Sequence, residues 1–95
     1  MKKLILIAAL TLSTAVKADT DTCEEIENFA RTIMSNRQSD VSLVSMIKVV
    51  KDNKLGKKMV IDAYESSMFN GKAYKDKTIN EFANKWYMTC IKTIK

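Results

Sequence analysis

Four stretches of the chain repeat their apolar side chains at helical spacing, with short polar breaks between them. From residue 22 to about residue 37, and again over 43–50 and 55–64, apolar residues recur every three or four positions and so share one face of an α-helix. The longest apolar face runs from residue 79 to residue 94. Because no stretch alternates with a period of two, the pattern predicts an all-α domain, a small bundle of about four helices.

Residues with capping preferences predict where these helices begin and end. A Thr-x-x-Glu pattern begins at Thr22 and again at Thr78, and such a capping box satisfies free N–H groups in the first turn of a helix. Ser42 is the expected cap of the second helix. Asn70-Gly71 is expected to end the third helix with a left-handed residue. Residues 72–77 are then a polar loop before the fourth helix.

The first eighteen residues have the layout of a secretory signal peptide, with two lysines, an apolar run and a stretch of small residues. The apolar run spans only residues 4–12, whereas a helix that crosses a bilayer needs about 20 apolar residues. We expect cleavage between Ala18 and Asp19, and a destination in the periplasm or outside the cell. The mature protein is then a single domain of residues 19–95 with no transmembrane segment.

The excess of basic residues is local once the signal peptide is set aside. The formal net charge is +5, and three of the basic residues lie in the predicted signal peptide, which leaves +2 for the mature chain. Five lysines crowd into eleven residues with a single acid among them: Lys48, Lys51, Lys54, Lys57 and Lys58. They are a candidate surface for anionic envelope components such as lipopolysaccharide or anionic lipid, and a plain solvated helix face is the alternative. Nucleic acid is not expected, because the protein is exported and no aromatic residue lies among the lysines.

The two cysteines, Cys23 and Cys90, fall on the apolar faces of the first and last helices. An even pair in a small exported domain is normally bridged. A bridge between them requires the first and last helices to run antiparallel. The chain has no C-x-x-C motif, so a redox-active pair is disfavoured.

The residue types that most enzymes need are missing or badly spaced. The chain has no His, two Cys and two Gly, which excludes His-based catalysis, Cys₄ or Cys₂His₂ zinc sites and a glycine-rich phosphate loop. Carboxylates at i,i+3 occur on two helices, but solvated helix faces explain them better than a glycosidase pair does. We therefore expect no catalytic residue, no metal and no cofactor, with a hydrolase as a remote alternative.

Aromatic residues are the remaining candidates for contact with a partner. Trp86 and Tyr87 are adjacent and point about 100° apart on a helix, so Tyr87 is expected near the rim of the core. Tyr64 lies on the third helix. Partly exposed aromatic side chains often anchor protein partners, and packing at the edge of the core is the alternative for all three.

Several stretches resemble a family of small exported two-cysteine helical proteins that are encoded by bacteria, phages and prophages. The matching positions are 23, 30–31, 33–34, 37–38, 59–60, 63–64, 82, 85–87 and 90. The link after Arg37-Gln38 departs from the family, which usually carries Gly there. The family has no assigned activity, so the resemblance implies export and a two-cysteine helical unit. It also makes Arg31 and Arg37 candidate partner-binding residues, with surface pairing, such as Arg31 with Glu27, as the alternative.

These features together favour a non-enzymatic periplasmic protein that binds an envelope protein. Inhibition of a cell-wall enzyme and phage-related modulation of the envelope are candidate mechanisms. One alternative is a small periplasmic stress chaperone. Another is direct binding of anionic envelope components through residues 48–58. The sequence leaves the partner, the oligomeric state and the binding surface open.

Overall fold

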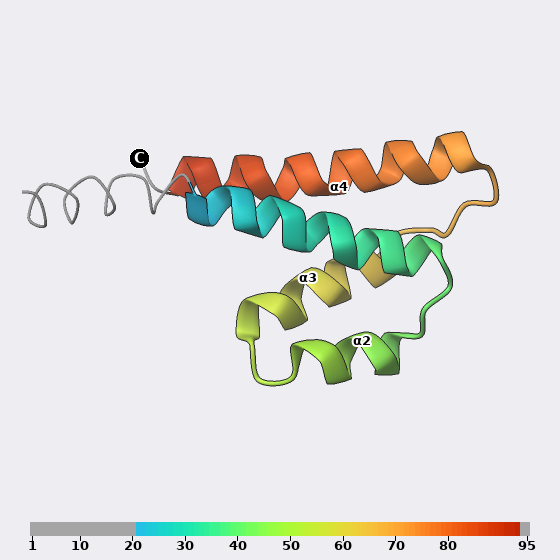
Figure 1. Cartoon of the computed structure of the whole chain (residues 1–95), viewed down its shortest axis with the longest axis horizontal. Helices are drawn as coiled ribbons and strands as arrows, with labels where there is room; N and C mark the ends of the chain where they lie inside the picture. The colour runs from blue at the N-terminus through green and yellow to red at the C-terminus, as the bar shows by residue number, and fades with distance from the viewer. Residues whose placement is uncertain (1–20, 94–95) are drawn as a thin grey trace, which may run out of the picture.

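The computed structural model of the protein describes residues 21–93, and these residues form four helices and no strand. An N-terminal helix covers residues 21–38 and is followed by α2 (Leu43–Val50), α3 (Lys54–Glu65) and α4 (Lys72–Thr93). The N-terminal helix and α4 lie side by side, and α2 and α3 form a hairpin against the other side of the N-terminal helix (Figure 1). The predicted all-α bundle is confirmed. The predicted signal peptide and its cleavage site between Ala18 and Asp19 lie outside the described residues.

A disulfide joins the outer ends of the two long helices. Cys23 and Cys90 are bonded, their Cα atoms lie 5.5 Å apart, and 67 residues separate them in the sequence. Cys23 is in the first described turn of the N-terminal helix, and Cys90 is in the last turns of α4. The expected antiparallel pair of first and last helices is therefore confirmed, together with the bridge that holds it.

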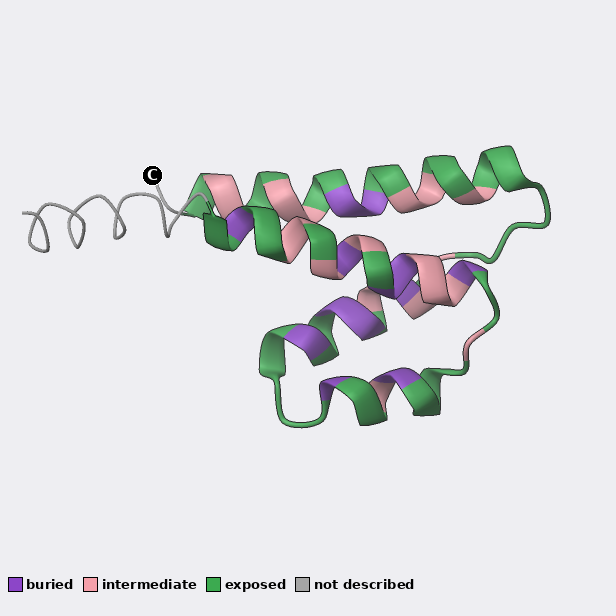
Figure 2. Ribbon diagram, viewed as in Figure 1, coloured by how far each residue is buried: buried purple, intermediate pink, exposed green. Residues whose placement is uncertain are grey.

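The core draws apolar side chains from all four helices, as the buried bands in Figure 2 show. Its buried members are Ala30, Ile33, Met34, Met46, Val50, Met59, Val60, Ala63 and Phe82. Leu43 and Leu55, which the periodicity places in this core, are exposed instead. They occupy the first and second positions of α2 and α3, where the end of a helix extends past its neighbours.

Two caps hold the hairpin at the beginning of its helices. The Ser42 hydroxyl accepts a hydrogen bond from the backbone N–H of Ser45 at 3.1 Å, so the cap predicted for α2 is confirmed. The side chain of Asn53 accepts one from the N–H of Gly56 at 2.8 Å and caps α3. Each bond satisfies one of the N–H groups that the first turn of a helix leaves free.

Both predicted capping boxes are wrong. The chain is already helical at residue 21, so Thr22 lies inside the N-terminal helix and is not its cap. Residues 72–77 are helical rather than a loop, which places Thr78 inside α4. Lys72 supports the early start of α4 through an ion pair with Asp76 at 2.7 Å, one turn further along the helix.

The left-handed residues also lie elsewhere than predicted. Helix α3 ends at Glu65, before Asn70-Gly71 is reached. Among the described residues the positive φ angles belong to Asp40 (67°) and Lys51 (49°), which turn the chain after the N-terminal helix and after α2. Neither residue is glycine, so the sequence predicted polar breaks here but not which residue would adopt the left-handed conformation.

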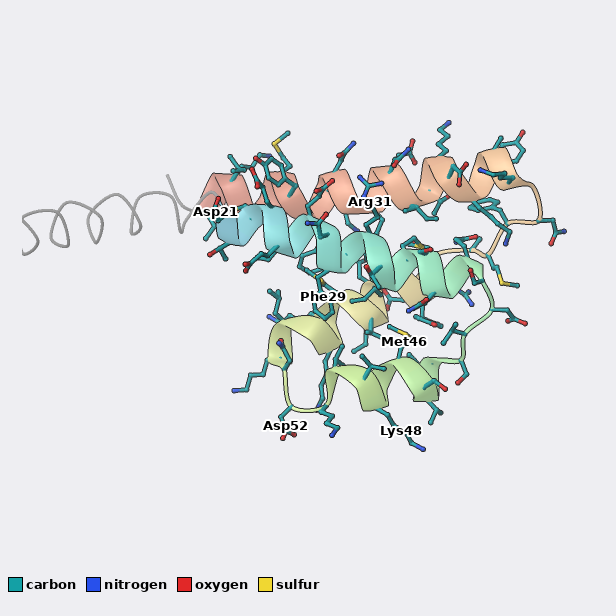
Figure 3. The ribbon with its side chains drawn as sticks, viewed as in Figure 1. Asp21, Phe29, Arg31, Met46, Lys48 and Asp52 are labelled. Carbon is teal, nitrogen blue, oxygen red and sulfur yellow. A yellow bond between two sulfur atoms is a disulfide. The ribbon has the colours of Figure 1, made fainter. Side chains whose placement is uncertain are left out.

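Gly56 lies where α3 packs tightly against Val50 of α2 and Phe29 of the N-terminal helix. A Cβ atom at this position would lie 2.9 Å from Cβ of Val50 and 3.3 Å from Cε2 of Phe29. Figure 3 shows the Phe29 side chain reaching from the N-terminal helix toward α3. Glycine inside a helix costs about 1 kcal/mol of stability relative to alanine. At this position the cost is offset because the missing Cβ lets the helices pack closely together.

We expect Gly56→Ala to lower the free energy of unfolding by about 1–2 kcal/mol, because overpacking outweighs the improved helix propensity. Urea denaturation followed by far-UV circular dichroism measures the change. Lys57→Ala, on the exposed side of the same turn, is the control and should stay within about 0.5 kcal/mol of the wild type. A stabilised Gly56→Ala variant would show that the contact is loose.

Candidate functional site

Arg31 lies on the face of the N-terminal helix that meets α4 (Figure 3). One guanidinium nitrogen forms an ion pair with Glu27 at 2.8 Å, as the surface-pairing alternative predicted. The other donates a hydrogen bond to the side-chain oxygen of Asn80 on α4. Arg31 therefore links the two long helices and stays partly exposed.

Arg37 and Tyr64, the next two candidates, bind to each other and to the backbone. Arg37 donates two hydrogen bonds to the carbonyl oxygen of Ser66, at 3.2 Å from Nε and 3.0 Å from Nη2. Its guanidinium carbon lies 5.0 Å from the centre of the Tyr64 ring, within range of a cation–π interaction. The Tyr64 hydroxyl donates to the carbonyl oxygen of Val41. Arg37 therefore holds the end of α3 against the N-terminal helix, and Tyr64 holds it against the turn that precedes α2.

The environment of Tyr64 makes the folded protein less stable at high pH. Burial raises the pKa of its hydroxyl above the ordinary 10.0, Arg37 offsets part of the rise, and Asp40 adds to it. Because the folded pKa is raised, the unfolded chain loses the proton first. The contribution of the neutral hydroxyl is complete below about pH 10 and is lost as the pH rises through the raised value.

We expect the free energy of unfolding of the wild type to fall more between about pH 9 and pH 11 than that of Tyr64→Phe. At neutral pH, Tyr64→Phe should cost about 1 kcal/mol, because it removes the donor to Val41. Urea titrations at a series of pH values measure both effects. Tyr74→Phe, at an exposed position, controls for the loss of a phenol. Parallel pH profiles for the wild type and Tyr64→Phe would contradict the assignment.

Trp86 and Tyr87 separate as the helical geometry predicted. The indole N–H of Trp86 donates to the Asp62 carboxylate at 3.0 Å, and Lys85 forms an ion pair with the same oxygen. Trp86 packs at the boundary of the core, with its ring centre 6.3 Å from that of Phe82. Tyr87 is half-buried and lines a shallow hollow of about 400 Å³, where its neighbours are Glu24, Glu27, Asn28 and Asn84.

The five candidate partner residues therefore do not form one site. Arg37, Tyr64 and Trp86 have their polar groups bonded inside the domain. Arg31 and Tyr87 lie on the side where the N-terminal helix meets α4.

Gln38, the buried polar residue of the described core, organises the loop between α3 and α4. It is only 3% exposed. Its side-chain N–H donates to the carbonyl oxygen of Ser67, and its side-chain oxygen accepts from the backbone N–H of Phe69, both at 2.9 Å. Arg37 binds the adjacent carbonyl oxygen of Ser66 in the same way. We call the side chains of Arg37 and Gln38 together the loop clamp. Gln38 lies one turn after Met34, on the apolar face of the N-terminal helix. A polar residue at such a position is the sequence signal for a buried polar contact.

The clamped loop and the first turn of α4 together present exposed apolar side chains, which we call the aromatic tip: Met68 and Phe69 on the loop and Tyr74 on α4. The Phe69 and Tyr74 rings stack with their centres 6.1 Å apart, and Tyr74 is 64% exposed. The α3–α4 loop lies at the opposite end of the long helices from the disulfide (Figure 1). The helical periodicity gave no indication that the rings of Phe69 and Tyr74 would meet in one exposed surface.

All five lysines of the lysine-rich stretch are exposed. Lys48 is on α2, Lys51 is its C-cap, and Lys54, Lys57 and Lys58 are on α3. None of the ion pairs in the described part of the chain involves these five lysines.

Residues 21–93 contain no group of three or more Cys, Asp or Glu side chains placed to hold a metal ion. None of the helices described here is long and apolar enough to span a membrane.

Comparison with known proteins returns nothing for this chain: no protein-family model, no curated protein and no solved structure matches it.

Proposed function

We propose that the mature chain is a non-enzymatic protein of the bacterial periplasm that binds an envelope protein through the aromatic tip. The observation that carries this proposal is that the tip is exposed while the loop clamp fixes its backbone from the interior. Exposed apolar residues on a loop are otherwise a liability, because they promote aggregation.

Aromatic side chains that insert into a partner supply much of the binding energy at protein interfaces. Binding usually requires loops to be ordered, and that ordering reduces affinity. The Gln38 side chain already holds both the N–H of Phe69 and the carbonyl of Ser67. A tip prepared in this way binds with a smaller entropy loss than a free loop does.

The disulfide and the N-terminal sequence support export. Disulfides persist in oxidising compartments such as the periplasm and are rare in the bacterial cytoplasm. The layout of residues 1–18 is that of a signal peptide. The resemblance to small exported phage and bacterial proteins agrees with this destination. Inhibition of a cell-wall enzyme, with the tip seated in its groove, is the candidate mechanism.

The test is retention of an envelope protein by the immobilised mature chain from periplasmic extract. We expect one protein to be retained by the wild type and lost with the double variant Phe69→Ser/Tyr74→Ser. Met88→Ser removes an exposed apolar side chain from α4 and is the matched control, which should retain the partner. Equal retention by the tip variant, or no protein retained by the wild type, would overturn the proposal.

A further inference from the structure

The α2–α3 hairpin carries a second unusual surface. Six of the eight residues of α2 are apolar, yet only Met46 and Val50 are buried. Leu43, Val44 and Val49 are 45%, 64% and 68% exposed. Lys48 points away from the bundle on the outer side of α2 (Figure 3). The outward side of this helix therefore mixes aliphatic side chains with a lysine.

Helix α3 repeats the same mixture. Lys54, Lys57 and Lys58 precede the exposed Ile61 by seven, four and three positions, so all four share one face of the helix. The buried side of α3 carries the core residues Met59, Val60 and Ala63. Both helices of the hairpin thus turn lysine and aliphatic side chains outward.

Residues 48–58, which form the turn of the hairpin and the adjoining parts of α2 and α3, are the most positive stretch of the described residues. The two other acids of the hairpin, Asp62 and Glu65, lie in the last turn of α3. Residues 48–58 hold five lysines and one aspartate, a net charge of +4. The other described residues hold nine acidic and seven basic side chains, a net charge of −2. An uneven distribution of this kind orients a protein on an anionic surface even when its overall charge is small.

We propose that the α2–α3 hairpin binds the surface of an anionic phospholipid bilayer. The lysines lie at the level of the headgroup phosphates, and the exposed valines and Ile61 reach the boundary between headgroups and acyl chains. A cluster of about five lysines is attracted to an anionic leaflet. Short amphipathic segments lie in the interface without crossing the bilayer.

A lipid surface fits this hairpin better than a protein partner does. The exposed aliphatic residues are interspersed with lysines along the two helices. No aromatic residue or arginine, the usual anchors of protein interfaces, occurs between residues 41 and 63. A fluid bilayer can accommodate dispersed contacts of this kind, whereas a protein partner needs a matched shape.

Bilayer docking is independent of the proposed function, because it uses different residues. In Figure 1 the α2–α3 turn lies below the two long helices, whereas the α3–α4 loop reaches their right-hand end. A protein docked by its hairpin therefore keeps the aromatic tip free for a partner in the envelope.

The test is co-sedimentation of the mature, disulfide-bonded protein with vesicles. We expect binding to phosphatidylcholine vesicles that contain phosphatidylglycerol, little binding to pure phosphatidylcholine, and a steep decrease with salt. The variant Lys48→Gln/Lys51→Gln/Lys54→Gln should bind about a hundredfold more weakly. Val44→Ser/Val49→Ser should bind about tenfold more weakly, because partial burial of two valines is lost.

The matched control removes the same charge elsewhere. Lys72→Gln/Lys77→Gln/Lys92→Gln changes three exposed lysines outside the hairpin and should bind as the wild type does. Equal weakening by both triple variants would overturn the proposal, because net charge alone would then explain binding. Equal binding to both vesicle types, or to lipopolysaccharide but not to phosphatidylglycerol vesicles, would overturn it as well. Should the valine variant fail to fold, the exposed lysine variants still decide the outcome.

Discussion

Replacing Cys23 and Cys90 with alanine is expected to lower the free energy of unfolding by about 4 kcal/mol. The bridge closes a loop of 67 residues, and the chain-entropy estimate for such a loop lies between about 3 and 5 kcal/mol. A chain of 77 residues, the length expected after cleavage of the predicted signal peptide, has a total stability of roughly 4–11 kcal/mol. Loss of the bridge therefore removes a large fraction of the stability, and urea denaturation of both proteins measures it.

Reduction of the wild type separates the effect of the bond from that of the side-chain change. The reduced wild type keeps both sulfur atoms, so it should lose nearly as much stability as the double alanine variant. A loss below about 1 kcal/mol in either protein would show that helix packing alone holds the bundle.

Gln38→Ala is expected to lower the free energy of unfolding by about 3 kcal/mol. The change removes a buried side chain and two hydrogen bonds to the α3–α4 loop. Gln38→Met keeps most of the volume and loses the same bonds, so it should cost less than Gln38→Ala. Urea denaturation measures both variants.

The same variants should also loosen the loop. Amide hydrogen exchange at Phe69 should be faster in both, because its N–H loses the Gln38 acceptor. Unchanged exchange at Phe69 in Gln38→Met would contradict the role of the loop clamp, whatever happens to global stability.

Periodicity and the cysteines were enough to predict the architecture. Apolar spacing identified all four helices, because burial of one face imposes it on the sequence. The pairing of Cys23 with Cys90 followed from their number and the predicted export, and it fixed the relative direction of the outer helices.

The start of α4 was not predictable from its composition. Four of the six residues in 72–77 are charged, which suggested a loop. Lysine and alanine are nevertheless good helix formers, and an exposed helix turn needs no apolar stripe. The Lys72–Asp76 pair, and the bond from Lys75 to the carbonyl oxygen of Gln38, supply local support that a hydrophobic pattern does not register.

The candidate site shows a different limit. Sequence selected Arg37, Tyr64 and Trp86 by residue type, yet their polar atoms point to Ser66, Val41 and Asp62 inside the domain. Whether an amphipathic side chain turns toward a partner or toward its own backbone depends on loops whose course is set by long-range contacts. The aromatic tip likewise depends on the course of the α3–α4 loop, which the contacts of Gln38 hold in place.

Site-specific photo-crosslinking in living bacteria tests the central claim most directly. A photoreactive amino acid is placed at residue 69 in the aromatic tip, at residue 44 on the hairpin, or at residue 88 as an exposed control on α4. The account predicts a discrete protein adduct in the envelope fraction from residue 69 and none from residues 44 and 88. No protein adduct from residue 69, or the same adduct from all three positions, would contradict it.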